Sequence, residues 1–276
     1  MPYIGVTGFM TPQEVRLIQR QFDKTSIRKL MVGVLVSSKT LKGLTNKYPR
    51  QFPSVGRVCE IFQNHHCSVN LIHYSSDKPD SLCEQLLTLV DVGGENLTGF
   101  QLNIAWPKIG ELEKFRAITD FKFRIVLQVG REALLGINCG ASEKVAEHLM
   151  RYADLIDDVL IDESAGTGKP LDVERTMEYF QEFREKGIEI GFGMAGGLGP
   201  ETLYLVERVR DKFPDISFDA QKELRDKHTD DLDVSLTEDY VCGAIYLLEL
   251  KKKEEEERKN IGKELRRENW KCDIGD

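Results

Sequence analysis

Residues 189–202 read EIGFGMAGGLGPET, and they contain the unit from which the whole fold is built. The stretch 189–194 is typical of a buried strand, and the glycines that follow it are typical of a turn. Pro200 followed by an acidic residue is typical of the first turn of a helix, which we expect to end near Lys212. A strand followed by a helix indicates a parallel sheet, because two parallel strands need a long crossover between them.

The same unit recurs along most of the 276-residue chain. Successive predicted strands start 24 to 37 residues apart, which leaves room for one helix and two loops. Eight such units fit a TIM barrel, a fold of about 250 residues, so we predict an α/β protein with a (β/α)8 barrel over residues 1–250. The predicted strands are 3–7, 31–36, 68–74, 99–104, 123–128, 158–162, 189–194 and 216–219.

The composition changes after residue 250. The stretch KKKEEEERK at 251–259 has no apolar face, and its opposite charges are spaced four apart, as on an exposed helix. We therefore expect residues 251–276 to form a charged helical tail that extends the last barrel helix. The alternative is a partner-binding arm that ends in Trp270 and Cys272.

The overall composition narrows the class of protein. With 41% hydrophobic and 30% charged residues the chain can bury a sizeable core, and its net charge of −8 argues against a general nucleic-acid binder. The N-terminus lacks a signal-peptide pattern, and no apolar run reaches the roughly 20 residues that cross a bilayer. The six cysteines form no Cys-x-x-Cys pair, which is typical of reduced thiols. We expect a cytoplasmic protein that binds neither nucleic acid nor membranes.

Glycine-rich loops follow the sixth and seventh predicted strands, and a lysine follows the eighth. The loops after the carboxyl ends of barrel strands form the active-site face. Gly196 and Gly197 follow the seventh strand and run into a predicted helix, whose first amides and dipole favour an anion. Lys222, after the eighth strand, can add a positive charge, and Gly166 and Gly168, after the sixth, let backbone amides approach a ligand. The sequence therefore predicts a small phosphorylated ligand.

Several of these stretches resemble motifs of the phosphoribosylanthranilate isomerase family. DVLIDESAGTGK at 158–169 resembles the family's sixth strand with its catalytic Asp and Gly-Thr-Gly-Lys loop, and AGGLGPE at 195–201 is similar to its phosphate loop. YPRQFPS at 48–54 is similar to the segment after the second strand. Gln101-Leu102-Asn103 stands where the family has Gln-Leu-His. The resemblance covers residues 1–248 in motif order.

The resemblance implies a TIM barrel that carries out an Amadori rearrangement without a cofactor, as a monomer or a homodimer. Asp162 takes the position of the acid that protonates the ribose ring oxygen, and burial near a substrate phosphate would favour its protonated form. Arg50 takes the position that holds the anthranilate carboxylate. Asn103 takes a substrate-binding position, and the glycines of the two loops take the phosphate.

The chain departs from the family where the general base is expected. The family has a cysteine in the first strand, and alignment on Gly5-Val6-Thr7 places Ile4 there, a side chain that cannot accept a proton. Loss of a positioned base lowers the rate about 10²–10⁴-fold. His73, at the end of the third strand, is the candidate replacement, because imidazole titrates in a useful range. Cys139, in the loop after the fifth strand, is a second candidate.

Three functions remain open from the sequence. The first is an isomerase-like barrel for a phosphorylated sugar or phosphoribosyl conjugate, with Asp162 as acid/base. The second is a phosphosugar lyase or hydrolase with altered chemistry, and the third is a non-catalytic sugar-phosphate-binding protein. A metal site is not expected, because His65 and His66 are adjacent and project in different directions. A nicotinamide site is not expected either, since no Gly-x-Gly-x-x-Gly follows the first strand.

Overall fold

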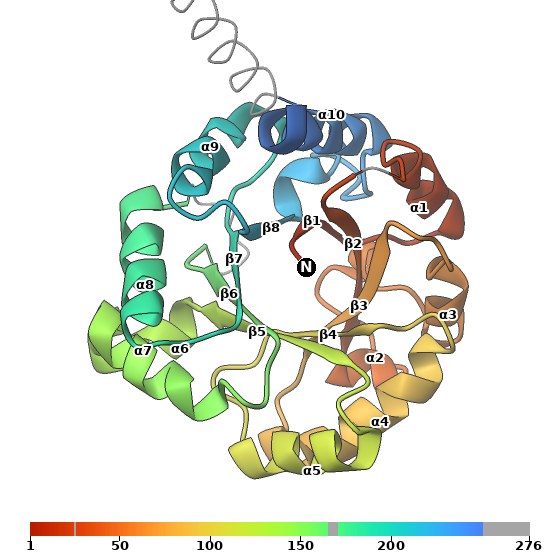
Figure 1. The fold of residues 1–276 in the computed structure, drawn as a ribbon. Coiled ribbons are helices and arrows are strands. Elements are labelled where there is room, and N and C mark those ends of the chain that lie inside the picture. The colour runs from red at the N-terminus through yellow and green to blue at the C-terminus, as the bar shows by residue number, and fades with distance from the viewer. Residues whose placement is uncertain (25, 165–170, 251–276) are drawn as a thin grey trace, which may run out of the picture.

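The computed structural model describes residues 1–24, 26–164 and 171–250, and its strands form one closed barrel (Figure 1). Each strand runs parallel to its neighbours in chain order, and the last strand pairs with the first. All eight predicted strands are confirmed, with ends that differ from the prediction by at most two residues. The strands are β1 (Tyr3–Thr7), β2 (Lys29–Ser37), β3 (Ser68–Ser75), β4 (Gly99–Leu102), β5 (Arg124–Gly130), β6 (Asp158–Asp162), β7 (Gly191–Ala195) and β8 (Ser217–Ala220).

Helices surround the barrel and connect its strands (Figure 1). The α-helices are α1 (Pro12–Gln19), α2 (Ser38–Leu41), α3 (Val58–Ile61), α4 (Leu82–Gly93), α5 (Ile109–Thr119), α6 (Arg131–Leu135), α7 (Ser142–Leu149), α8 (Val173–Glu185), α9 (Tyr204–Arg210) and α10 (Val234–Ile245). Short 3-10 turns are η1 (Pro49–Gln51), η2 (Val55–Arg57), η3 (Pro79–Ser81), η4 (Asn138–Gly140), η5 (Met150–Tyr152), η6 (Pro200–Thr202) and η7 (Lys222–Leu224), and η8 (Tyr246–Leu250) is a π-helical turn.

Local sequence signals place the helix starts. Thr11 caps α1: its Oγ1 accepts the Glu14 N–H at 3.2 Å, and Glu14 Oε2 accepts the Thr11 N–H at 3.0 Å. This reciprocal pair satisfies amides that the first turn leaves free, and Pro12 needs no donor there. Asp172 and Asp233 cap α8 and α10 with one side-chain acceptor each.

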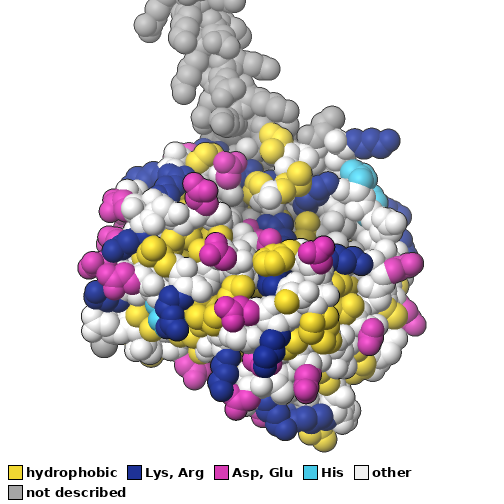
Figure 2. Space-filling model, turned by 60° about the horizontal axis from the view of Figure 1, so that its bottom comes forward, with side chains coloured by type: hydrophobic (Ala, Val, Ile, Leu, Met, Phe, Trp, Pro, Cys, Tyr) yellow, Lys and Arg dark blue, Asp and Glu magenta, His cyan; other side chains and the backbone are white. Residues whose placement is uncertain are grey.

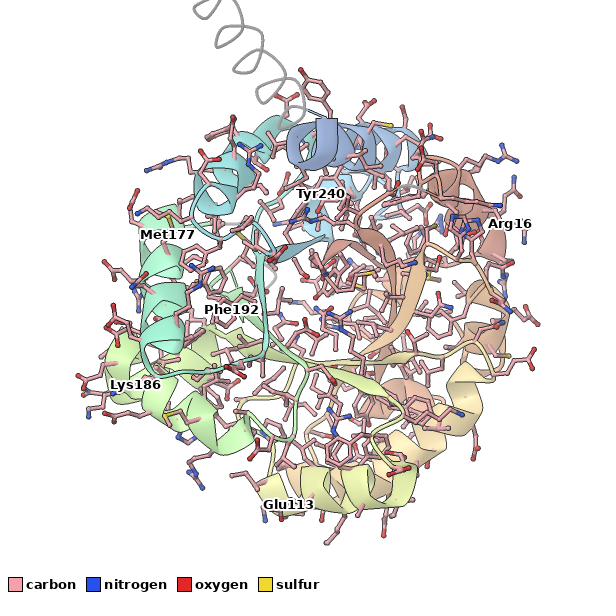
Figure 3. The ribbon with its side chains drawn as sticks, in the orientation of Figure 1. Arg16, Glu113, Met177, Lys186, Phe192 and Tyr240 are labelled. Atoms are coloured by element: carbon pink, nitrogen blue, oxygen red, sulfur yellow. The ribbon has the colours of Figure 1, made fainter. Side chains whose placement is uncertain are left out.

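Successive side chains along each strand point to opposite faces of the sheet, so they pack in two separate cores. A small cluster fills the barrel interior, made by Tyr3, Met31, Leu71, Val126, Leu160 and Ala195. The larger core lies between the strands and the helices. There Phe192 of β7 stacks on Phe180 of α8 with ring centroids 5.2 Å apart, and Figure 3 shows Phe192 in the layer between barrel and helix.

An ion pair closes the amino end of the barrel interior. Arg124, the first residue of β5, binds both carboxyl oxygens of Asp158, the first residue of β6, through Nε and Nη2 at 2.6 Å each. The guanidinium also lies 5.2 Å from the ring centroid of Tyr3. The Asp158 side chain is only 4% exposed, so its charge depends on this partner. A glycine at position 191 makes the room, because a Cβ there would lie 2.0 Å from Asp158 Oδ1.

The surface carries charges of both signs. On the face that Figure 2 shows, acidic and basic side chains are interspersed among small apolar areas. Within residues 1–24, 26–164 and 171–250, no helix combines the length and the apolar character that a bilayer-crossing segment needs. The charged tail predicted for 251–276 lies outside the described residues.

The Arg124–Asp158 pair gives a testable stability prediction. Asp158→Asn removes the buried carboxylate and leaves the partly buried guanidinium of Arg124, 17% exposed, without this partner, so we expect the free energy of unfolding to fall by about 3 kcal/mol. Urea denaturation at neutral pH measures it. The control is Asp80→Asn, which breaks the ion pair between Asp80 and Lys108. The Lys108 side chain is 61% exposed and the Asp80 side chain is 75% exposed. That change should cost less than about 1 kcal/mol, and equal losses in the two variants would contradict the prediction.

Candidate active site at the carboxyl ends of the strands

Polar side chains from six strands meet inside the barrel near the carboxyl ends of those strands. Each is at most 7% exposed and forms a hydrogen bond to at least one other member of the group. We call this group the mouth network. Its members are Thr7 of β1, His73 of β3, Gln101 of β4, Gln128 of β5, Asp162 of β6 and Asp219 of β8.

Asp162 ends β6 and belongs to the mouth network. Its Oδ1 accepts hydrogen bonds from the Ser164 amide at 3.0 Å and the Ser164 hydroxyl at 2.6 Å. Its Oδ2 accepts one from Gln128 Nε2 at 2.8 Å. Three donors on two oxygens suit the ionised carboxylate, which only accepts. This arrangement differs from the protonated Asp162 that the family role implies.

The acceptor character of Asp162 orients the rest of the network. Since Gln128 turns its NH2 toward Asp162, its Oε1 faces the other way and accepts from His73 Nε2 at 3.0 Å and from Gln101 Nε2 at 3.3 Å. Gln101 Nε2 donates its second hydrogen to Asp219 Oδ2 at 3.2 Å. The two glutamines thus link the two carboxyl groups across the barrel.

The network ends in two acceptor atoms without partners. With Nε2 donating, His73 is the tautomer whose Nδ1 carries a lone pair, and burial lowers the pKa of His73 below its usual 6.5. Neither His73 Nδ1 nor Gln101 Oε1 has a hydrogen-bond partner among the described residues, and both atoms are buried. Such atoms are costly to leave unpaired, so the network favours a ligand that brings N–H or O–H groups.

Asp219 differs from Asp162 in its surroundings. The Thr7 hydroxyl lies 3.0 Å and 2.8 Å from its two oxygens, and Gln101 supplies the other side-chain donor. Burial raises the pKa of Asp219 to about 7, and the charge of Asp162 adds to the increase, while the hydrogen bonds from Thr7 and Gln101 oppose it. Asp219 therefore exchanges a proton near neutral pH.

The structure also shows where the side chain of Ile4 lies, the residue that the motif alignment puts in the place of the family's general base. Ile4 faces the outer core, so its side chain does not point toward the mouth network. The inward position is Gly5, whose Cα pairs in register with that of Asp219. A Cβ at Gly5 would lie 2.8 Å from Asp219 Oδ1, so the carboxyl occupies space that a side chain from β1 would need. The expectation that Ile4 stands in the position of a catalytic side chain is therefore corrected.

The loop after β7 has the backbone that its glycines allow. Gly196 and Gly197 both have positive φ, 122° and 60°, a region that other residues rarely adopt. The Thr202 hydroxyl accepts from the Gly199 amide at 2.9 Å and lies 2.8 Å from the Gly197 carbonyl. The glycines do not run directly into an α-helix as predicted, because η6 intervenes and α9 begins only at Tyr204. Pro200 starts the tight turn, and the Thr202 cap holds it.

The loops after β2 and β8 hold one another. Arg50 binds Asp231 through Nε and Nη2, both at 3.0 Å, and the two side chains are 58% and 49% exposed. Gln51 Nε2 donates to both oxygens of Asp230 at 2.9 Å. The Arg50 guanidinium, predicted to hold a substrate carboxylate, thus has a protein carboxylate as its partner in this structure.

The remaining predicted residues divide into exposed ones and ones outside the described residues. Asn103 follows β4 and is exposed, and its amide donates to the Tyr74 carbonyl at 2.9 Å. Lys222 begins η7 after β8 and is exposed. Gly166 and Gly168 lie outside the described residues, as does the side chain of Cys139.

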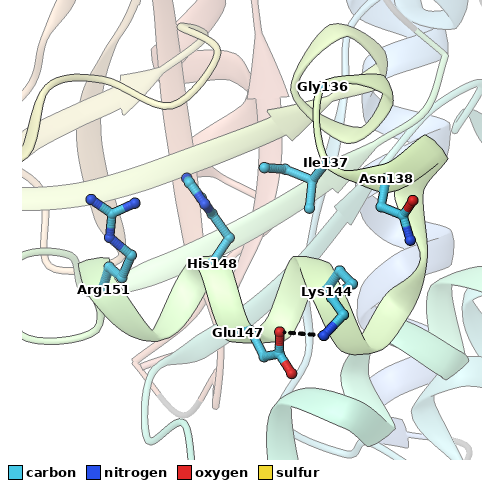
Figure 4. A pocket seen from close by; sticks show the side chains of 7 residues that line it. All are labelled: Gly136, Ile137, Asn138, Lys144, Glu147, His148 and Arg151. Carbon is cyan, nitrogen blue, oxygen red and sulfur yellow. Dashed lines mark hydrogen bonds and ion pairs between the residues drawn. The ribbon is translucent and has the colours of Figure 1, made fainter.

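A separate hollow lies on the outer surface beside α7 (Figure 4). Its volume is about 420 Å³, and it is lined by Gly136, Ile137, Asn138, Lys144, Glu147, His148 and Arg151. Lys144 Nζ and Glu147 Oε2 form an ion pair of 2.8 Å there. None of these residues belongs to the mouth network. Among the described residues, no group of three or more His, Cys, Asp or Glu side chains is arranged to hold a metal ion.

Comparison with known proteins identifies the fold. No protein-family model and no curated protein matches the chain. Among solved structures, it is similar to the putative copper homeostasis protein CutC from Streptococcus agalactiae, with 12% identity, a TM-score of 0.50 and coverage of 79% of this chain and 99% of that one. It is also similar to a fungal endo-beta-N-acetylglucosaminidase of glycosyl hydrolase family 18, with 13% identity, a TM-score of 0.51 and coverage of 89% and 98%.

A third similar structure is the carboxyl transferase domain of Rhizobium etli pyruvate carboxylase with pyruvate. The identity is 7% and the TM-score 0.56, over 90% of this chain and 48% of that one. At these identities the likeness shows the fold alone, a TIM barrel. None of these three proteins is named a phosphoribosylanthranilate isomerase, so the family resemblance remains a prediction from the motifs.

Sequence reasoning did not single out Asp219, Gln128 or Thr7 as functional. A signal for them was present: polar residues at the inward positions of predicted strands, close to the carboxyl end, among otherwise apolar neighbours. Applying the two-residue period to all eight strands would have selected them. The two-residue period of a strand does not show which of these side chains contact one another.

The titration of Asp219 makes protein stability depend on pH. The folded protein keeps the Asp219 proton up to about pH 7, whereas the unfolded chain loses it near pH 3.9. The stabilising contribution is therefore complete below about pH 4 and is lost as the pH rises to about 7. Asp219→Asn cannot titrate, so the unfolding free energy of the wild type minus that of the variant should fall by roughly 2 kcal/mol between pH 5.5 and 8.5.

Urea denaturation of both proteins at the two pH values measures this difference. The control is Asp215→Asn, an exposed aspartate two residues before the start of β8, where the same comparison should give no change. A difference between wild type and Asp219→Asn that is the same at both pH values would contradict the prediction.

Proposed function

We propose that the protein is an isomerase-like enzyme that acts on a phosphorylated sugar or phosphoribosyl conjugate by acid–base chemistry in the mouth network. The observation that carries this proposal is the pair of buried carboxyl groups, Asp162 and Asp219, joined through two glutamines at the carboxyl end of the barrel. Opening a sugar ring and moving a proton from C2 needs one group that gives a proton and one that takes it. Two carboxyl groups in unlike surroundings can supply both.

The unpartnered acceptors support a ligand rich in hydroxyl groups. His73 Nδ1 and Gln101 Oε1 are buried next to the carboxyl pair and need donors. The hydroxyl groups of a sugar chain are donors of suitable size, and pairing them with buried acceptors favours binding. An apolar ligand would leave both atoms unsatisfied. A polyhydroxylated skeleton therefore fits the mouth network better than a hydrocarbon does.

The loop after β7 is the proposed place for the phosphate. Gly196 and Gly197 adopt positive φ and have no side chains, so their backbone can approach an anion closely. Lys222, in the adjacent loop after β8, brings a positive charge to the same side of the barrel. The proposal depends on loop amides and this lysine rather than on the dipole of α9, which begins too late in the chain.

The motif resemblance gives the reaction its proposed form. In the Amadori rearrangement of a phosphoribosyl amine, protonation of the ring oxygen opens the ring to an imine, and loss of the C2 proton then leads to the aminoketose. Asp162 stands where the resemblance places the acid/base group, and the mouth network supplies a second carboxyl group. The pair also suits proton transfer at C2 of an aldose phosphate, which is the same chemistry without the amine.

Asp162→Asn tests the proposed activity. With N-(5-phosphoribosyl)anthranilate and D-ribose 5-phosphate as probes in D2O, the wild type should form the ketose product with deuterium at C1, because the C2 hydrogen is removed and a solvent hydrogen is added at C1. Asp162→Asn should lower both rates about 10²–10⁴-fold, because it removes a group that moves a proton. Product and deuterium are followed by NMR. Asp154→Asn, an exposed aspartate in the turn before β6, serves as the control and should react at the wild-type rate.

The outcomes separate the functions that the sequence left open. Binding of both probes without turnover or exchange would favour a non-catalytic sugar-phosphate-binding protein. Release of phosphate or cleavage of the sugar would favour a lyase or hydrolase. Neither binding nor turnover with any probe would reject the proposal.

Gly197→Ala tests the phosphate site separately. A Cβ at a φ of 60° strains the loop and blocks close approach, so affinity for ribose 5-phosphate should fall at least about tenfold by calorimetry. Gly187→Ala provides the matched control, because Gly187 also has positive φ, 71°, but lies just after α8 with open space around a Cβ. Unchanged affinity in Gly197→Ala would exclude this loop as the phosphate site.

A further inference from the structure

We infer that the part of the substrate that enters the mouth network carries a protonated amino group, so that the substrate is a sugar phosphate with a basic amine. This inference rests on the proposed function and deepens it by naming the substrate class. It is carried by the kind of atom that the network leaves unpaired and by the neutral surroundings of its two carboxyl groups. The family resemblance, by contrast, implies an aromatic amine that bears a carboxylate.

The two buried atoms without partners are both hydrogen-bond acceptors. Gln101 is 1% exposed, and its Nε2 lies between two acceptor oxygens, Gln128 Oε1 at 3.3 Å and Asp219 Oδ2 at 3.2 Å. Only an NH2 group can face two acceptors, so the atom of Gln101 left unpaired is its carbonyl oxygen. His73 is 5% exposed, and its Nε2 donates to the same Gln128 oxygen, so Nδ1 of the neutral ring carries a free lone pair.

These two acceptors belong to one wall of the barrel, next to both carboxyl groups. His73 of β3 and Gln101 of β4 are paired in register on neighbouring strands, and both donate to one oxygen of Gln128. Gln101 is in turn bonded to Asp219 at 3.2 Å, and Gln128 to Asp162 at 2.8 Å. A ligand group that pairs with the free acceptors therefore lies within one or two hydrogen bonds of each carboxyl group.

The carboxyl groups of the network accept hydrogen bonds from neutral groups. Asp162 accepts from an amide side chain, a hydroxyl group and a backbone amide, and Asp219 accepts from the same three kinds of group. Within residues 1–24, 26–164 and 171–250, no positively charged side chain donates to either one. Attraction between opposite charges is stronger in a buried site than in water, so a positively charged ligand group is favoured over a neutral one.

An ammonium group matches these surroundings better than a hydroxyl group does. An ammonium group has three N–H donors and no lone pair, so it satisfies acceptors and needs no donor in return. The lone pairs of a ligand hydroxyl need donors, but the Thr7 hydroxyl, His73 Nε2 and the NH2 group of Gln101 are already used within the network. His73 is then a substrate-binding residue rather than the replacement base that the sequence predicts, because the ammonium group uses its lone pair.

The loop after β2 agrees with a substrate that lacks an aromatic carboxylate. Arg50, which the resemblance assigns to that carboxylate, binds both oxygens of Asp231 at 3.0 Å. The next residue, Gln51, binds both oxygens of Asp230 at 2.9 Å. A substrate carboxylate would need the same two-point contact with the guanidinium and would have to displace Asp231. An amino group without a carboxylate makes no such demand.

Three ligands that differ at a single position test the inference. D-Glucosamine 6-phosphate, D-glucose 6-phosphate and N-acetyl-D-glucosamine 6-phosphate share one sugar skeleton and one phosphate, and their C2 carries an ammonium group, a hydroxyl group or a neutral amide. Calorimetry with the full chain at about pH 6.5, where the amine is protonated, measures the three dissociation constants. We expect D-glucosamine 6-phosphate to bind at least about tenfold more tightly than either of the other two.

His73→Phe tests which side chain binds the ammonium group. Phenylalanine keeps a ring but removes both nitrogens, and Gln128 Oε1 keeps its hydrogen bond from Gln101. The preference for D-glucosamine 6-phosphate over D-glucose 6-phosphate should fall at least about threefold, because a hydrogen bond to a charged donor is stronger than one to a neutral donor. The matched control is His148→Phe, whose ring packs against Trp106 outside the mouth network and whose replacement should keep the wild-type ratio.

The results separate this inference from the proposed function. Equal affinities for the three ligands, or no binding of any of them, would overturn the ammonium site, and the proposed function would still stand if N-(5-phosphoribosyl)anthranilate or D-ribose 5-phosphate is converted. A preference for D-glucosamine 6-phosphate that is lost in His73→Phe supports the ammonium site, even if no sugar phosphate is converted and the proposed function fails. Weaker binding of all three ligands in His73→Phe, with an unchanged ratio, would contradict the role of His73.

Discussion

The unfavourable ionisation of a carboxyl group inside the barrel is the constraint on which the site depends. Asp219 is 5% exposed, and a group so far from water is stable only when hydrogen bonds surround it or when it holds a proton. The backbone makes room for this: a Cβ at Gly33 would lie 2.5 Å from Thr7 Oγ1, and one at Gly5 would lie 2.8 Å from Asp219 Oδ1. The Thr7–Asp219 contact therefore requires glycine on both β1 and β2.

The buried carboxyl groups at the two ends of the barrel interior differ in their hydrogen-bond partners. At the amino end, Asp158 receives both of its hydrogen bonds from one arginine, and the pair is complete within the protein. At the carboxyl end, the mouth network contains two carboxyl groups, no cation and two acceptors without partners among the described residues. The Arg124–Asp158 pair is thus satisfied within the protein, while the mouth network keeps two acceptor atoms that a ligand can satisfy. This division matches the general placement of active sites in TIM barrels.

The fold could be predicted from the sequence because apolar strands alternate with helices at a regular spacing, and each of the eight predicted strands lies within two residues of its observed bounds. The placement of Asp162 at the end of β6 followed from the same spacing. Two details could not follow from it. The inward position of β1 is Gly5 rather than Ile4, since the alignment by motif ignored the two-residue period of a strand. The link between Asp219 and Asp162 runs through Gln101 and Gln128, whose contacts across strands appear only when the barrel closes.

The most direct test of this account is the titration of the Asp219 carboxyl carbon by 13C NMR in the wild type, with Asp219→Asn used to assign its signal. A midpoint near pH 7, well above that of an exposed aspartate, is expected. A midpoint below about 5 would show that water or protein donors stabilise the charge after all, and it would contradict the central claim.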